Sequence, residues 1–208
     1  MKFKTLPATV VMAALGFAGA VSVGTPASAS AFPREGGFID SSGTYTYVRG
    51  NPTAINNAGV VTGSNLGGLE GAGFIDSGGT YTTINVPGAT TVNNGYTTPI
   101  AINDAGVVTG SYYNGLTSPG FIDSGGAFTT LNPPGAIDSM ITGINDAGAV
   151  AGYYFNSDYD EVGFVYSGGT YTNVNPPGSI ESGVTGINDS GAVTGQRPQS
   201  GVARPAVG

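Results

Sequence analysis

A block of about forty residues is repeated four times along this chain, and no other feature constrains the fold as strongly. Each copy carries a turn of the type Ile-Asn-Asp-Ala-Gly, and successive turns begin 42 to 47 residues apart. The turns occupy residues 55–59, 102–106, 144–148 and 187–191. Periods near forty residues are typical of propellers, solenoids and repeat arrays. We therefore expect supersecondary units of one kind, stacked against one another.

Each block also contains a Gly-Phe segment, a Gly-rich turn, and a strand in which an aromatic residue and threonines alternate. The Gly-Phe segments occupy residues 37–40, 73–76, 120–123 and 163–166. Alternation with a period of two, carried by Tyr, Thr and Ile, is typical of strands, as in residues 81–85. Beyond the first 31 residues, Gly and Pro interrupt every window long enough to form a helix. The sequence predicts an all-β body.

The Asn-Asp-Ala-Gly turns predict tight hairpins. Asn or Asp opens a type I turn, and Gly then takes the left-handed position of a G1 bulge, where a Cβ carries a steric penalty. We expect positive φ at four glycines, which are Gly59, Gly106, Gly148 and Gly191.

Four strands per block, followed by a longer Pro-Gly connection, predict the antiparallel meander of a propeller blade. The predicted blades span residues 53–86, 100–133 and 142–175, with half a blade at 184–195. Residues 37–49 supply only the third and fourth strands, so pairing them with 184–195 would close a ring of four blades and remove exposed sheet edges. The expected fold is a β-propeller of four blades of four antiparallel strands, closed by its N-terminal strands. A recurring glycine at Gly63, Gly110, Gly152 and Gly195 is interpreted as a packing position.

The N-terminal segment differs from the repeats. Lys2 and Lys4 precede an apolar stretch of residues 10–23 and a small-residue segment, the pattern of a secretory signal peptide at 1–31. The expected organisation is this leader, a repeat domain at 32–196, and a C-terminal tail at 197–208. We expect a secreted, extracellular protein with no membrane insertion, since the apolar stretch is too short to span a bilayer.

Charge and missing residue types exclude several functions. Beyond the leader, four arginines face 13 acidic residues, and residues 50–196 contain no Lys or Arg. Nucleic-acid binding is therefore excluded, because it requires several basic contacts to phosphates. The chain has no Cys and no His, which excludes Ser-His-Asp and Cys-His catalysis and typical zinc sites.

The combined pattern Gly-Ile-Asn-Asp-x-Gly-x-Val-x-Gly, then Gly-Phe, then Gly-Gly-Thr-Tyr-Thr-x-Ile-Asn-x-Pro-Gly resembles the bacterial extracellular repeats of the HAF family, over residues 36–196. That family is named for a His-Ala-Phe triplet, and of this triplet only Phe is present here, at Phe38, Phe74, Phe121 and Phe164. The resemblance implies a secreted, propeller-like repeat protein without an established enzymatic activity. It identifies no ligand.

Carboxylates are the remaining catalytic groups. A glycosidase needs two of them about 5 to 10 Å apart, and the candidates are Asp138, Glu161, Glu181 and Glu70. They form no repeated or clustered set in the sequence, so we expect no enzyme, with a carboxylate glycosidase as the alternative. Most other Asp residues lie in turns, where they cap their own backbone.

One acidic loop suggests calcium. Asn156, Asp158, Asp160 and Glu161 place oxygen atoms at nearly alternate positions, as a loop wrapped around Ca²⁺ does, although the glycine and terminal Glu of an EF-hand are missing. The alternative is a solvated acidic loop, and no other cofactor is expected.

Binding is expected at the connections between the second and third strands, which vary most between copies. Two of them carry tyrosines, which are Tyr112, Tyr113, Tyr153, Tyr154 and Tyr159. Tyrosine stacks on a sugar face while its hydroxyl forms a hydrogen bond, so a glycan, matrix polymer or envelope component is the expected partner. The alternative is that alternate tyrosines continue the strand and pack between blades. A further alternative function is a structural protein that assembles with copies of itself.

Overall fold

A computed structural model describes residues 36–65, 71–90, 96–179 and 181–197. The chain divides into two compact units, Met1–Pro33 and Arg34–Gly208, and all of these residues belong to the second. The expected signal peptide and all but the first residue of the expected tail lie outside the described residues. No described helix is long and apolar enough to cross a membrane.

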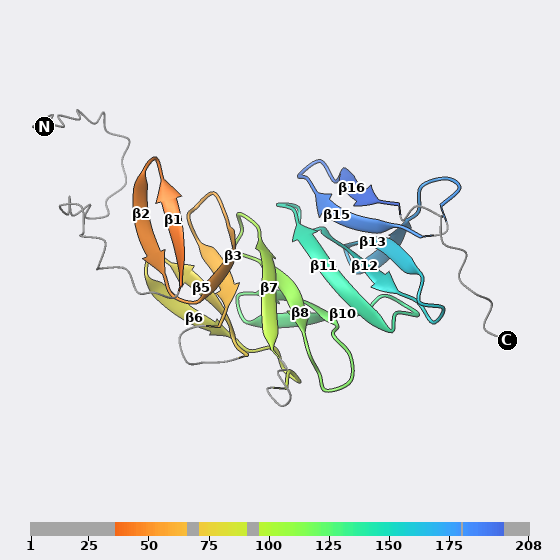
Figure 1. Cartoon of the computed structure of the whole chain (residues 1–208), viewed down its shortest axis with the longest axis horizontal. Helices are drawn as coiled ribbons and strands as arrows, with labels where there is room; N and C mark the ends of the chain where they lie inside the picture. The colour runs from red at the N-terminus through yellow and green to blue at the C-terminus, as the bar shows by residue number, and fades with distance from the viewer. Residues whose placement is uncertain (1–35, 66–70, 91–95, 180, 198–208) are drawn as a thin grey trace, which may run out of the picture. The chain divides into compact units, whose positions relative to one another are not determined.

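Sixteen strands form the described part of the chain (Figure 1). The first sheet contains β3 (Asn51–Ile55), β4 (Val61–Ser64), β5 (Gly73–Ser77) and β6 (Thr80–Ile84). The second sheet contains β7 (Thr97–Ile102), β8 (Val108–Tyr112), β9 (Gly120–Ser124) and β10 (Ala127–Leu131). The third sheet contains β11 (Asp138–Ile144), β12 (Val150–Phe155), β13 (Glu161–Ser167) and β14 (Thr170–Val174). Each sheet pairs its strands antiparallel in chain order, so the predicted meanders are confirmed.

Two hairpins flank these sheets. The N-terminal hairpin is β1 (Gly37–Ser41) with β2 (Thr44–Val48), and the C-terminal hairpin is β15 (Gly183–Ile187) with β16 (Val193–Gln196). The sequence predicts that they pair with each other to complete a fourth blade. In the described residues, each remains a separate two-stranded sheet.

Neighbouring sheets pack through their second and first strands. β4 lies against β7, β8 against β11, and β12 against β15. The first strand of each sheet has an irregularity in register at the same place. At two of these irregularities a threonine hydroxyl donates to a carbonyl oxygen of the neighbouring sheet. Thr53 Oγ1 donates to Pro99 O at 2.9 Å, and Thr142 Oγ1 donates to Val184 O at 3.1 Å. The recurring glycine marks a close backbone approach within a sheet: at Gly110 of β8, an added Cβ would overlap the carbonyl oxygen of Thr98 on the adjacent strand β7.

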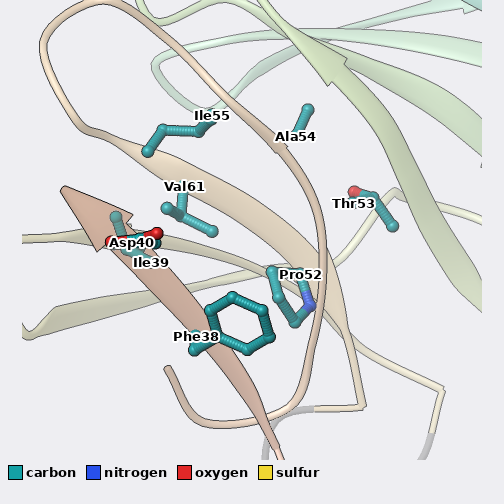
Figure 2. Close-up of a pocket in the computed structure, with 8 residues that line it drawn as sticks. All are labelled: Phe38, Ile39, Asp40, Pro52, Thr53, Ala54, Ile55 and Val61. Carbon is teal, nitrogen blue, oxygen red and sulfur yellow. The ribbon is translucent and has the colours of Figure 1, made fainter. Parts of the chain in front are cut away.

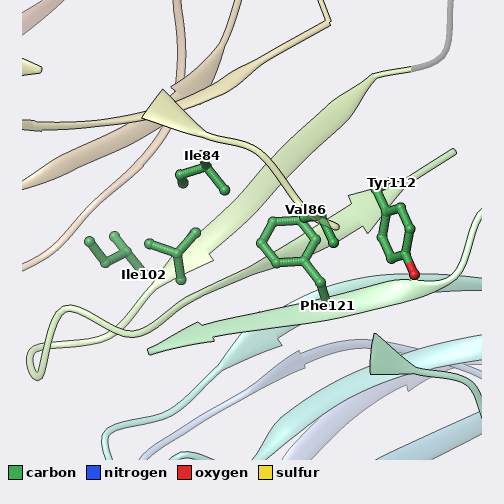
Figure 3. Close-up of a cluster of buried hydrophobic side chains, with 6 residues drawn as sticks. Ile84, Val86, Ile102, Tyr112 and Phe121 are labelled. Carbon is green, nitrogen blue, oxygen red and sulfur yellow. The ribbon is translucent and has the colours of Figure 1, made fainter. Parts of the chain in front are cut away.

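The core consists of three equivalent clusters. Each contains the last aliphatic residue of one sheet or hairpin, a valine from the second strand of the next sheet, and a phenylalanine from its third strand. These core triads are Val48, Val61, Phe74; Ile84, Val108, Phe121; and Leu131, Val150, Phe164. All nine residues are at most 2% exposed (Figure 3 shows the second cluster). Burial of one sheet's last strand in its neighbour therefore holds the sheets together.

The Asn-Asp-Ala-Gly turns join the sheets as well as the strands. The four predicted glycines have φ between 76° and 81°, which confirms the left-handed positions. In addition, Asn56 Nδ2 donates to Asn103 O at 3.0 Å, Asn103 Nδ2 to Asn145 O at 3.1 Å, and Asn145 Nδ2 to Asn188 O at 3.0 Å. This asparagine ladder connects one turn to the next along one end of the sheets.

Candidate functional site

The tyrosines proposed for binding divide by strand alternation. Tyr112 and Tyr154 are 7% and 6% exposed and belong to the core clusters of the second and third sheets. Their hydroxyls lie 3.2 Å from Thr130 Oγ1 and 3.4 Å from Asn173 Nδ2. The packing alternative applies to these two residues, which offer little surface to a ligand.

Tyr113 lies on the opposite face and is half-buried. Its backbone N–H donates to Tyr96 O at 3.2 Å, and its hydroxyl donates to Gly115 O at 3.0 Å. Tyr96 is 51% exposed and Leu116, at the tip of the adjoining turn, is 90% exposed. Sequence reasoning missed Tyr96 because it precedes β7 in a connection. Extending the register from the pair Thr97 and Tyr112 would have placed it opposite Tyr113.

The loop at residues 156–160 repeats the geometry of the Asn-Asp-Ala-Gly turn at the other end of the third sheet. Asn156 N donates to Asp160 O at 3.1 Å and Tyr159 N donates to Asn156 O at 2.9 Å, as Asn56 and Gly59 do in the first turn. Tyr159 therefore occupies the left-handed position, with φ of 63°, that glycine takes in the Asn-Asp-Ala-Gly turns. Its side chain is 66% exposed.

This geometry leaves the calcium hypothesis without a ligand cluster. Asn156 Oδ1 accepts from the N–H groups of Asp158 and Asp160, both at 2.9 Å, so it closes the turn. Glu161 begins β13, and its carboxylate lies beside Gly183 of β15. Among the residues that the structure describes, no group of three or more His, Cys, Asp or Glu is placed to hold a metal ion.

A row of side chains crosses the same end of the third sheet. Asp138, Phe155 and Glu161 are directly opposite one another on β11, β12 and β13. The Tyr153 ring meets the Phe155 ring edge-on, with centroids 5.9 Å apart. Ser118 N, in the loop of the second sheet, donates to Asp138 Oδ1 at 3.2 Å. The loop ends of the second and third sheets are therefore continuous.

Carboxylates make this end electronegative. Burial raises the pKa of Glu161, and the nearby charge of Glu181 raises it further. Burial also raises the pKa of the Tyr153 hydroxyl, with smaller contributions from the charges of Glu161 and Asp138. Asp138 and Glu161 therefore act on the Tyr153 hydroxyl, and Glu181 acts on Glu161. Glu70 lies outside the described residues.

A separate groove lies at the N-terminal hairpin. Its volume is about 300 Å³, and β1, β3 and Val61 of β4 line it (Figure 2). The lining residues are Phe38, Ile39, Asp40, Pro52, Thr53, Ala54, Ile55 and Val61. Since Asp40 is the sole titratable residue of this lining, the groove offers no pair of groups for acid–base chemistry.

A scan against protein-family models finds no match to the chain, and a search of curated proteins finds none either.

Proposed function

We propose that this chain is a secreted, non-catalytic repeat protein that binds a neutral, hydroxyl-rich polymer such as an extracellular glycan. The binding surface would be the tyrosine end of the second and third sheets, formed by Tyr96, Tyr113, Tyr153 and Tyr159. The main support for the proposal is the conformation and exposure of Tyr159. Tyr159 is a large, exposed aromatic residue in a left-handed backbone position that the Asn-Asp-Ala-Gly turns of the same geometry give to glycine. Backbone strain of this kind is concentrated at functional sites.

The surrounding chemistry supports a neutral polymer. Aromatic rings pack against the apolar faces of sugars, and the carboxylates of Asp138, Glu161 and Glu181 can accept hydrogen bonds from sugar hydroxyls. An anionic polysaccharide is disfavoured, because residues 50–196 contain no Lys or Arg to offset these charges.

The same proposal includes a propeller architecture. The N-terminal and C-terminal hairpins would pair edge to edge into a fourth four-stranded sheet, as the ring predicted from the sequence requires. The order of strand types supports this pairing, since the C-terminal hairpin supplies the first two strands of a repeat and the N-terminal hairpin the last two. The resemblance to HAF repeats is in keeping with a secreted, propeller-like protein.

The test is Tyr159→Gly, for which stability and binding are expected to change in opposite directions. Glycine removes a left-handed cost of about 1 to 2 kcal/mol, of which about half is offset by its greater freedom in the unfolded chain. Retention on insoluble neutral glycans should fall several-fold, while the melting temperature is maintained or raised. The control is Tyr45→Ser, which removes another exposed tyrosine, 56% exposed on β2. Serine replaces glycine here because glycine would weaken the strand. Equal retention of the Tyr159→Gly variant and wild type would contradict the proposal.

A carboxylate glycosidase is the second candidate, favoured by the raised pKa of Glu161 beside Glu181. A carboxyl group whose pKa is raised by its surroundings can serve as a general acid. Glu161→Gln would abolish hydrolysis in a screen of glycan substrates, and a wild-type protein inactive on all of them would eliminate this candidate.

A further inference from the structure

We infer that the C-terminal hairpin of one copy pairs with the N-terminal hairpin of a second copy, so that two chains share a four-stranded sheet. This inference rests on the fourth sheet of the proposed function and names its partner as another molecule of the same chain.

A fourth core triad is present in the sequence but divided between the two ends of the described chain. By position in the repeat, its members are Val174 at the end of β14, Val193 in β16, and Phe38 in β1. Val174 and Val193 are half-buried and Phe38 is 64% exposed, whereas every member of the three complete triads is at most 2% exposed. Joining β16 to β1 would bring the three residues together as in the other sheets.

Three internal pairings define how the strands would meet. β4 pairs with β5, β8 with β9, and β12 with β13, and in each the recurring glycine of the second strand is opposite the phenylalanine of the third. Applied to the hairpins, this register places Gly195 opposite Phe38, Thr194 opposite Ile39 and Val193 opposite Asp40. The new interface would continue a pairing that the chain already makes three times.

Thr194 provides a second, polar correspondence. Its equivalents Thr62 and Thr109 are fully buried, and their hydroxyls donate to the carbonyl oxygens of Phe74 at 2.8 Å and Phe121 at 2.7 Å. Thr194 is exposed, and its hydroxyl lies 3.3 Å from that of Thr185. In the shared sheet, the Thr194 hydroxyl would donate to Phe38 O.

The groove at the N-terminal hairpin is where this segment would lie. Between the complete sheets, the second strand of one sheet packs on the first strand of the next, as β4 packs on β7. β3 has no such strand before it among the described residues, and Ile55 is 52% exposed where its equivalent Ile102 is 8% exposed. β16 is a strand of the second type, and its insertion beside β1 would cover Ile55.

A second copy is the occupant because the two hairpins remain separate two-stranded sheets in the described chain. The C-terminal hairpin packs on β11, β12 and β13, while β1 packs on β3. In the described chain the outer edges of β1 and β16 are both without a strand partner. Complementary, non-identical edges on one molecule produce a head-to-tail interface, and exposed edges are a ready template for pairing between chains.

Engineered disulfides test this register directly, since the chain contains no native cysteine. The variants Ile39→Cys and Thr194→Cys are prepared separately, mixed and mildly oxidised, and the products are separated on a non-reducing gel. Opposite residues of antiparallel strands have Cα atoms about 4.5 to 5.5 Å apart, within the range of a disulfide. The double variant Thr62→Cys/Ile75→Cys is the positive control, because these residues are already paired within the first sheet. Ile39→Cys mixed with Val193→Cys is the off-register control.

We expect at least about tenfold more linked dimer from the matched mixture than from the off-register mixture, because a slip of one residue moves the side chain to the other face. A double variant Ile39→Cys/Thr194→Cys that forms a disulfide only within single chains would overturn the role of a second copy and leave the fourth sheet intact. If the positive control is linked and neither format links residues 39 and 194, the fourth sheet itself is refuted. Glycan retention is measured independently of all three results.

Discussion

Replacing Asn103 of the asparagine ladder by alanine should lower the free energy of unfolding by an amount that follows from its hydrogen bonds. Asn103 is 5% exposed, its Oδ1 accepts from Val107 N at 2.9 Å, and its Nδ2 donates to Asn145 O at 3.1 Å. Removing the side chain deletes both bonds. The carbonyl oxygen of the buried Asn145 then loses this donor, at a cost of about 1 to 3 kcal/mol, and loss of the bond within the turn adds about 1 kcal/mol. We expect the free energy of unfolding to fall by about 2 to 4 kcal/mol.

Asn188→Ala is the matched control. Asn188 Oδ1 accepts from Ala192 N at 2.9 Å and from the Ser190 hydroxyl at 2.7 Å, so the same bond within the turn is lost together with one exposed hydroxyl bond. The residue is exposed, and its carbonyl still receives Asn145 Nδ2. The expected loss is about 1 kcal/mol. A larger loss for Asn103→Ala than for Asn188→Ala reports the buried bond between the second and third sheets.

Urea unfolding followed by far-ultraviolet circular dichroism measures both variants, at a protein concentration low enough to avoid association. A loss of 2 to 4 kcal/mol corresponds to a decrease in melting temperature of roughly 4 to 16 °C for a domain of this size. Because the stability of repeat proteins depends on contacts between neighbouring units, Asn103→Ala should also broaden the transition. If the two variants lose the same stability within about 0.5 kcal/mol, the ladder does not couple the sheets.

Two other perturbations follow from burial and charge. Phe121→Ala should lower the free energy of unfolding by about 3 to 5 kcal/mol, because Phe121 is fully buried in a complete core triad. Phe38→Ala should lower it by less than about 1 kcal/mol in dilute solution, because Phe38 is 64% exposed. Equal losses in denaturant titrations would contradict the distinction between complete and divided core triads. Because folding raises the pKa of Glu161, its favourable contribution is present below the unfolded value and is lost as pH rises through the folded pKa. Glu161→Gln should therefore raise the melting temperature near pH 7, and this gain should vanish below about pH 4. If the difference in melting temperature between variant and wild type does not change with pH, burial and Glu181 do not raise the pKa of Glu161.

Local chemistry made the strands and turns predictable from the sequence. Glycine at a left-handed position and alternation of Thr with aromatic residues act within a few neighbouring residues, so Gly106 and the strand at Thr80–Ile84 could be placed without tertiary contacts. The order of strands followed from the short turns. Pairing between the two hairpins depends on contacts that neither hairpin specifies alone, and it is absent from the described strand pairs.

The candidate site was less predictable because it depends on side-chain direction. Tyr112 and Tyr113 are adjacent and chemically identical, yet strand alternation buries the first and leaves the second on the other face. Asp138 and Glu181 are far apart in sequence, but they occupy the same position in successive repeats, at or just before the start of the first strand. Aligning the repeats from their irregularities in register, Ile141/Gly143 and Val184/Gly186, would have placed both at the tyrosine end.

The two ends of the sheets are under different physical constraints. At the turn end, Asn56, Asn103 and Asn145 each serve their own turn and the next one, so a substitution such as that of Asn145 disturbs two units at once. At the loop end, a turn such as 156–160 is closed by its own Asn156, and a change there costs stability only locally. Tyr159 can occupy a strained position because the hydrogen bonds of Asn156 hold the loop whatever the exposed side chain is. The loop end can therefore vary in sequence without loss of the fold, and this freedom is the physical reason to expect ligand recognition there.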